Sequence, residues 1–224
     1  MADPALYRLL AWLSPSYPVG AFAYSHGLEW AVETGQIHDQ VTMRAWIDDL
    51  IRYGGGWSDA VLFANAHAAD DDIDALIKLN DYALALAPSA ERYLETSAQG
   101  TAFLKVTRDA WNCDLVDRAK GALGQDVAYP MAVALAAAGH GIDRSASLHA
   151  FLHAVVANLV SAGVRLIPLG QTDGQRALAE LEGPVSETVA QALNAPIDDI
   201  GGIAILSDIA AMKHETQYTR LFRS

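Results

Sequence analysis

Helical periodicity runs along almost the whole chain, and no other feature limits its possible folds as strongly. The longest pattern begins at Ser145 and continues to Val164, with apolar residues at i, i+3, i+4 and i+7 spacing. This spacing marks one face of a helix, and the later part is apolar nearly all round, as in a helix at the centre of a domain. No segment shows the strict alternation of a half-buried strand. The sequence therefore predicts an all-α protein.

Turn and capping residues divide the remainder of the chain into further helices. Pro15 ends the first, because the residue before a proline avoids helical angles, and Gly35 is a suitable left-handed cap for the second. Asp72 and Ser89 are suitable N-caps. The predicted helices cover residues 6–13, 22–34, 46–51, 61–69, 73–86, 89–106, 129–138, 145–164, 185 onward and 203–211, with one more after a turn at 170–174. We therefore expect one helical-bundle domain of roughly ten helices over residues 1–211 and an extended tail over residues 212–224.

The composition supports a packed core and argues against several classes of protein. Hydrophobic residues make up 52% of the 224 residues and charged residues 19%. That is enough apolar material for a core and too little charge for a disordered chain. The formal net charge of −12 counts against nucleic-acid binding, because phosphate contacts need Lys and Arg. Cys113 is the single cysteine, so neither an intrachain disulfide nor a CxxC motif can form.

The sequence predicts neither a membrane span nor a secretory signal. The most apolar window, residues 151–169, contains Asn158, Arg165 and Pro168, so we expect a buried helix there. Residues 1–4 lack the basic stretch and apolar run that a secretory signal needs. A cytoplasmic location is the simplest expectation.

Residues 212–224 differ from the rest of this acidic chain in charge and aromatic content. They carry three basic residues and one acidic residue, together with Tyr218, Leu221 and Phe222. Chain ends are usually disordered unless something holds them, and Arg and aromatic side chains are enriched at binding hot spots. We therefore expect this tail to dock, either on the body of its own chain or on a partner.

Motifs for metal or phosphate chemistry are incomplete. His149 and His153 are four residues apart on the long helix, a spacing that can hold a metal, but no further ligand lies near them in sequence. His214-Glu215 begins like a zinc-protease motif, yet Tyr218 stands where the second histidine is required. The glycine run at 54–56 has no following lysine and is not a phosphate loop. Ordinary histidines and a helix break are the preferred interpretations.

Residues 22–30 mix large aromatic side chains with small ones. Ser25 and His26 are adjacent, and adjacent side chains on a helix diverge, so we expect no nucleophile–base pair. Gly27 inside a helix would cost about 0.5–1 kcal/mol relative to Ala, and the close approach of another backbone would explain it. Glu29 is the one carboxylate of this element. It is either a solvated capping residue or a contact to a partner or to a transient metal.

Polar residues also enter the end of the long helix. Asn158 and Arg165 stand among apolar residues shortly before Pro168. Buried polar groups must be hydrogen-bonded. We therefore expect these two residues either to fix neighbouring loops or to belong to a binding surface.

Several motifs in order along the chain resemble the urease accessory protein F (UreF) family. The opening signature is met by Ser14-Pro15, Pro18-Val19-Gly20 and the run Phe22, Tyr24, Ser25, Gly27, Leu28, Glu29. The middle resembles the family at Glu95-Thr96, Gln99-Gly100, residues 158–161 and residues 170–175, and the end does so at residues 215–224. His149 and His153 do not belong to the family pattern.

The resemblance implies a non-enzymatic, all-α protein that acts in nickel insertion into urease. Family members bind UreD, called UreH in some organisms, and this pair recruits the nickel-carrying GTPase UreG and delivers nickel to apo-urease. It further implies modulation of GTP hydrolysis by UreG, a homodimer in the assembled complex and a C-terminal tail that docks on UreD. No cofactor is expected, and nickel passes only transiently.

Partner binding is thus the predicted role of the candidate residues, and none is assigned to catalysis or to a metal. The candidates are Tyr218, Arg220, Leu221, Phe222, Arg223 and Ser224 in the tail and Tyr24, Glu29 and Arg165 in the body. Two alternatives remain open. One is a small helical metal-dependent hydrolase that draws three or more ligands from His26, Glu29, His149, His153 and His214. The other is an effector-binding helical regulator, which requires an enclosed apolar pocket.

Overall fold

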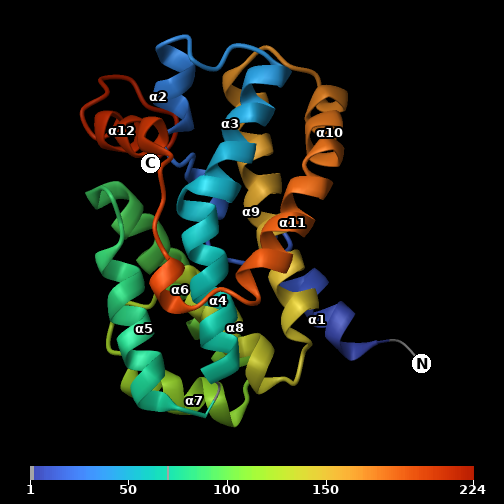
Figure 1. Ribbon diagram of the computed structural model, residues 1–224, viewed down its shortest axis with the longest axis vertical. Helices are drawn as coiled ribbons and strands as arrows, with labels where there is room; N and C mark the ends of the chain where they lie inside the picture. Colours follow the sequence, from blue (N-terminus) through green and yellow to red (C-terminus); the bar gives the residue numbers. More distant parts are fainter. Residues whose placement is uncertain (1–2, 70) are drawn as a thin grey trace.

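Twelve α-helices and two short 3-10 helices make up the part of the chain that the computed structural model describes, residues 3–69 and 71–224 (Figure 1). No strand occurs among these residues, so the predicted all-α class is confirmed. The α-helices are α1 (Pro4–Trp12), α2 (Leu28–Glu33), α3 (Gln40–Tyr53), α4 (Gly55–Ala69), α5 (Ile73–Ala85), α6 (Ala90–Ala110), α7 (Asp114–Ala122), α8 (Tyr129–Gly139), α9 (Arg144–Leu166), α10 (Gln171–Glu180), α11 (Glu182–Ala192) and α12 (Ile205–His214). The 3-10 helices are η1 (Ala21–Ala23) and η2 (Ile197–Asp199). Met1 and Ala2, part of the segment expected to lack a secretory signal, lie outside the described residues.

Helices α4, α8 and α9 form the centre of the bundle. The Ala-rich helix α8 packs against α4, α6, α7 and α9, and every residue from Pro130 to Ala137 is buried. Small side chains suit such a helix because they let its neighbours approach closely. Aromatic rings link these three helices to one another and to α6. The centroid distances are 6.0 Å for Phe103–Tyr129, 5.5 Å for Tyr129–Phe151 and 5.3 Å for Phe151–Phe63, within the range of favourable ring pairs.

Helix α9 runs through this core, as predicted for residues 145–164. By length and apolarity the helix could also cross a membrane, but half of its most apolar stretch is buried inside the protein. Its inward residues include Leu148, Phe151, Leu152 and Leu159. The core helix of a folded domain has these properties, so the structure agrees with the predicted buried helix.

The predicted helix over residues 22–34 is wrong in its first half. Residues 21–23 form η1, and α2 begins only at Leu28. Between them His26 and Gly27 both adopt left-handed backbone angles, with φ of 57° and 75°, which end any right-handed helix. Gly27 does meet another backbone, because a Cβ there would lie 2.5 Å from the amide nitrogen of Ala211. The expected close approach is confirmed, although the glycine precedes the helix.

Several other boundaries differ from the prediction. Helix α4 begins at Gly55, directly after the Gly54 cap of α3, so the glycine run interrupts the helices by a single residue. Helix α10 begins inside the predicted turn at 170–174, and α7 was missed because only Leu115, Val116 and Ala119 are buried on this charged helix. The predicted N-caps Asp72 and Ser89 are confirmed: their side chains accept the N–H groups of Ala75 and Arg92.

The predicted boundary between residues 211 and 212 falls inside α12, which continues to His214. The tail therefore comprises residues 215–224. Helix α12 packs on α2 and α6, and the end of the chain lies beside α12 and α2, far from the N-terminal end (Figure 1). This arrangement places the tail where two segments distant in sequence meet.

Candidate functional site

The tail folds back on the body of its own chain. Arg223 N–H donates to the carbonyl of Ala23 (2.8 Å), and Ser25 N–H donates to the carbonyl of Ser224 (2.7 Å). The Ser25 hydroxyl donates to the same carbonyl. Phe222 is only 4% exposed and Ser224 is fully buried. The tail was expected to dock either on its own chain or on a partner, and in this structure it docks on its own chain.

Glu29 is the main anchor of the tail backbone. It stands in the first turn of α2, is 7% exposed, and accepts the N–H groups of Leu221 (2.7 Å) and Phe222 (2.9 Å). Hydrogen bonds to a carboxylate are stronger than those to neutral acceptors. The interpretation of Glu29 as a solvated capping residue is therefore wrong, because its carboxylate is buried and supplies the tail with acceptors.

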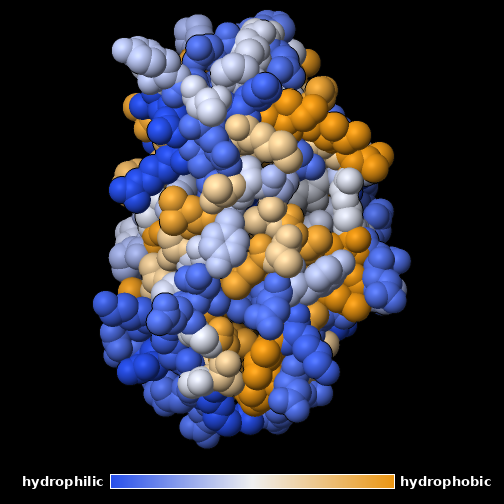
Figure 2. Space-filling model, turned by 90° about the vertical axis from the view of Figure 1, so that its left-hand side faces the viewer, coloured by the Kyte–Doolittle hydropathy of each residue, from blue (hydrophilic) through white to orange (hydrophobic). Residues whose placement is uncertain are grey.

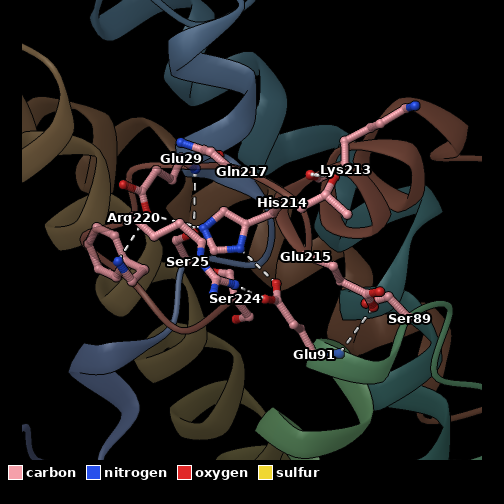
Figure 3. A network of polar contacts seen from close by, with 12 residues as sticks. Ser25, Glu29, Ser89, Glu91, Lys213, His214, Glu215, Gln217, Arg220 and Ser224 are labelled. Atoms are coloured by element: carbon pink, nitrogen blue, oxygen red, sulfur yellow. Dashed lines mark hydrogen bonds and ion pairs between the residues drawn. The ribbon is translucent and has the colours of Figure 1, made fainter.

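A second acidic residue, Glu91 in the first turn of α6, ties the tail to another helix (Figure 3). Its Oε2 lies 2.6 Å from Nδ1 of His214, and its Oε1 accepts a hydrogen bond from Arg220 Nη1 at 2.6 Å. His214 Nε2 lies 3.1 Å from Glu29 Oε2. The tail also helps to cap α6, because Glu215 Oε1 accepts the N–H of Ala90 (2.7 Å). Charged side chains thus join α6 to the tail at two places, through Glu91 of the helix and through Glu215 of the tail.

Glu95, one turn further along α6, holds the end of the tail. Its buried carboxylate accepts the hydroxyl of Ser224 (2.7 Å) and lies 2.7 Å from His26 Nδ1, and Arg92 pairs with it. Burial alone would raise the pKa of Glu95, but Arg92, His26 and the Ser224 hydroxyl outweigh it and lower this pKa to about 2. Burial, followed by the charge of Arg92, lowers the pKa of His26. The end of the tail is therefore held by an ionised Glu95 that Arg92 and His26 flank.

The polar residues of α9 fix the loop on which the tail lies. Arg165 Nη1 donates to the carbonyl of Phe22 (3.0 Å), and its guanidinium stands 4.4 Å from the centroid of the Phe222 ring. Asn158 donates to the carbonyl of Tyr24 (3.4 Å), whose side chain is buried. The expectation that Asn158 and Arg165 fix neighbouring loops is confirmed. Arg165 and Glu95 thereby hold Phe222 and Ser224 of the tail on the body of the protein, and Asn158 holds Tyr24 in the adjoining loop.

The solvent-facing side of the tail and of α12 exposes several large apolar side chains. Tyr218 is fully exposed and Leu221 is 64% exposed, while Arg220 and Arg223 also lie at the surface. Helix α12 buries Ala210, Ala211 and His214 and leaves its other side exposed. We call that side the α12 face; it comprises Ile205, Leu206, Ile209 and Met212. Figure 2, a view of the side of the molecule on which α12 lies, shows hydrophobic patches among hydrophilic residues. Exposed apolar patches of this kind are typical of protein interfaces.

Sequence reasoning missed the α12 face and the role of Glu91. An apolar helix pattern is the same whether the apolar residues are buried or exposed, and the spacing of Ile205, Ile209 and Met212 is the only sign that they share a face. Glu91 has no local feature that distinguishes it from other exposed glutamates. The α12 face and the role of Glu91 can be recognised only once the position of α12 in the fold is known.

The histidines do not converge on a metal site. Among residues 3–69 and 71–224, no three His, Cys, Asp or Glu side chains are grouped so that they could hold a metal ion. His149 Nδ1 contacts the carbonyl of Ser145 (2.9 Å), one turn earlier in α9. His26 and His214 pair with different carboxylates, Glu95 and Glu29. The convergence of three ligands that the hydrolase alternative requires is not found in the described part of the chain.

Two cavities meet at Asp59 of α4. One, of about 290 Å³, is lined mainly by apolar residues such as Trp12 and Tyr129, and the other, of about 130 Å³, lies toward α12. Both are smaller than the roughly 300–1,000 Å³ of most ligand pockets. Neither of these two cavities therefore has the size that the effector-binding alternative requires.

Asp59 is a partly buried carboxyl group beside these cavities. No hydrogen bond or ion pair joins it to another residue of the described ranges. Burial raises its pKa from 3.8 to about 6, and the charge of Arg92 only partly opposes this. The unfolded chain ionises first as the pH rises, so this residue lowers stability between about pH 4 and pH 6, and the full cost remains above that range.

We expect Asp59→Asn to raise the free energy of unfolding at neutral pH by about 1–3 kcal/mol. The gain should disappear below about pH 4, where the wild-type carboxyl is protonated in both states. Denaturant unfolding at the two pH values measures this difference. Asp49→Asn, an exposed change on α3, is the matched control and should have little effect at either pH. If Asp59→Asn instead lowers stability at neutral pH, the Asp59 charge has a stabilising partner.

Known proteins resemble this chain over nearly its full length. The model of the family described as UreF matches residues 37–182. A urease accessory protein UreF of Rhodopseudomonas palustris strain TIE-1 is 51% identical over 222 residues, 98% of this chain and 92% of that protein. UreF of strain HaA2 of the same species is 53% identical over 98% of this chain and 94% of its own. UreF of Bradyrhizobium sp. strain BTAi1 is 52% identical over 99% of this chain and 92% of its own. These relatives also span the tail and Glu29, which lie outside the matched range of the family model.

Proposed function

The chain belongs to the UreF family of urease accessory proteins, and from this membership we propose that it is an adaptor in nickel insertion into urease. The family consists of accessory proteins and not of enzymes. In this proposal the chain works in the cytoplasm with UreD (UreH), recruits UreG and modulates its GTP hydrolysis, and acts on apo-urease. It needs no cofactor of its own, and nickel passes only transiently.

One observation carries the proposed docking on UreD: an anchored tail lies beside an exposed apolar helix face. Glu29 holds the tail backbone, and Glu91 holds the side chains of His214 and Arg220. Tyr218, Leu221 and Arg223 are exposed in this fixed arrangement. The α12 face adds four exposed apolar side chains. Aromatic, aliphatic and arginine side chains held rigidly are favourable binding anchors, because little conformational freedom remains to be lost.

Deletion of residues 218–224 is expected to abolish co-purification with UreD and to lower the nickel content of urease. The deletion removes both the exposed side chains of the tail and the stretch of backbone whose N–H groups Glu29 accepts. Pull-down from cells and metal analysis of purified urease measure the two effects. Leu221→Asp is the matched variant, because it leaves the backbone anchors in place and should weaken docking without releasing the tail. Full urease activity in the deletion strain would contradict the proposal.

A second copy of the chain is proposed to bind at helix α1. Leu6, Tyr7 and Leu10 are exposed there, next to a groove of about 900 Å³ between α1, α9, α10 and α11. An apolar helix beside an apolar groove allows a two-fold arrangement in which each copy covers the other. Light scattering on the complexes of the deletion experiment reports whether two copies are present, and a single copy would refute this part.

A further inference from the structure

The ring of His214 is fully buried between two acidic side chains. Nδ1 lies 2.6 Å from Glu91 Oε2 and Nε2 lies 3.1 Å from Glu29 Oε2. The carboxylates belong to α6 and α2, and His214 is the last residue of α12. Figure 3 shows the ring between Glu29 and Glu91. The ring therefore joins three helices at the point where the tail begins.

A neutral imidazole cannot satisfy both contacts. It carries one N–H group, so the second ring nitrogen would direct a lone pair at a carboxylate oxygen. Because the side chain is 0% exposed, water cannot replace the missing hydrogen bond, and a buried polar group without a partner is costly. An imidazolium carries two N–H groups and donates one to each carboxylate.

The other contacts of the two carboxylates favour their ionised forms. Glu91 Oε1 accepts from Arg220 Nη1 (2.6 Å), and a proton on Glu91 would weaken this ion pair. Glu29 accepts two tail N–H groups, one on each oxygen. With an imidazolium, the charges of Glu29, Glu91, His214 and Arg220 balance. With a neutral ring, a negative charge would stay unbalanced in a largely buried cluster, which is unfavourable.

No neighbouring cation replaces the ring. Besides Glu29, Glu91 and Arg220, the charged groups on α2, the first two turns of α6, α12 and the tail are Glu33, Arg92, Glu95, Asp208, Lys213, Glu215 and the exposed Arg223. Arg92 pairs with Glu95 and also contacts His26. Glu33 accepts from Gln217, and Glu215 caps α6. Lys213 is exposed. The buried ring of His214 thus contacts both Glu29 and Glu91, and neither Arg92 nor Lys213 takes its place.

We propose that His214 is a positioning residue that, as an imidazolium, holds residues 215–224 on the body of the protein. We call the tail closed when residues 215–224 lie on the body of the protein, as in this structure, and open when they are released. Closing of the tail then takes up a proton whenever the ring is neutral in the open state. By linkage, a rise in pH favours the open state. The tail is therefore closed while the ring carries both protons, and it opens when a rise in pH removes one of them.

This behaviour carries over to partner binding if the tail docks as proposed above, and this one step rests on that proposed function. The closed tail holds Tyr218 and Leu221 in a fixed arrangement, whereas an open tail must be ordered again when a partner binds. Ordering on binding lowers affinity. Binding of UreD should therefore weaken as the pH rises.

The test uses the full-length chain without a partner. NMR records the ring nitrogen shifts of His214 and the hydrogen exchange of the Leu221 and Phe222 amides from about pH 6 to about pH 8.5, corrected for the pH dependence of intrinsic exchange. We expect both ring nitrogens to carry protons in the closed state and the protection of both amides to fall with pH. His214→Gln should raise exchange at the two amides on the order of tenfold to a hundredfold at the acidic end, and it should remove the pH dependence. His38→Gln, a change in an exposed histidine, is the matched control.

A second variant keeps the test informative if His214→Gln does not fold. Glu91→Gln can donate an amide N–H to the ring, so a neutral His214 can satisfy both neighbours and the pH dependence should be lost. A neutral ring in the closed state of the wild-type chain, or protection that does not change with pH, overturns the proposal. The pH dependence of UreD binding is measured separately. If tail protection falls with pH while UreD binding stays constant, the proton-linked tail stands and its docking role is refuted.

Discussion

Replacement of Glu29 by alanine is expected to release the tail from the body of the protein. The substitution removes the acceptor of the Leu221 and Phe222 N–H groups and one of the two partners of His214. A hydrogen bond to a charged group contributes about 1.5–3 kcal/mol, and a buried donor left unpaired adds its own cost. We expect exchange of the Leu221 and Phe222 amides to rise on the order of 100-fold or more, while the helical core stays folded.

Three measurements check the Glu29→Ala variant: hydrogen exchange of the tail, assembly with UreD, and GTP hydrolysis by UreG in the assembled complex. The variant should lose tail protection and weaken assembly together, because the same carboxylate holds the tail that presents the docking side chains. Glu180→Ala removes a half-exposed glutamate that pairs with Arg44 far from the tail, and it is the matched control. Unchanged assembly and unchanged GTP hydrolysis would show that Glu29 has a structural role only.

Substitution of Gly27 by alanine is expected to separate α12 from α2. A Cβ at this position would lie 2.5 Å from the amide nitrogen of Ala211 and 2.8 Å from the carbonyl carbon of Ala210. Both atoms belong to the backbone, so a side-chain rotation cannot relieve the contact and α12 must move. The left-handed φ of 75° adds strain, about 1–2 kcal/mol for a residue with a Cβ. We expect a total loss of about 3–5 kcal/mol.

Gly35→Ala separates the two causes of this loss. Gly35 has the same φ of 75°, but a Cβ there would meet nothing within 4 Å. The control should therefore lose only the strain term, and denaturant unfolding of the two variants measures the difference. Because α12 carries His214, Gly27→Ala should also release the tail, whereas Gly35→Ala should not. Equal losses in the two variants would show that α12 shifts at little cost.

Local features of the sequence were sufficient for the helical class and for many boundaries. The apolar spacing from Leu148 to Val164 predicted α9, and the side chains of Asp72 and Ser89 cap the helices that follow them. The α-helix is stabilised by contacts between residues three and four apart, so its signs lie within one segment. The prediction failed at His26 and Gly27, whose left-handed angles leave no mark in the hydrophobic pattern.

The composition of the last residues predicted that the tail docks, but only the tertiary structure decided where. Glu29 and Leu221 are 192 positions apart, and Glu95 and Ser224 are 129 apart. Partners at such distances leave no periodic pattern in a single sequence. The packing of α12 on α2 and α6 brings them together. For the same reason, the two carboxylates that flank His214 can be identified only in the folded protein.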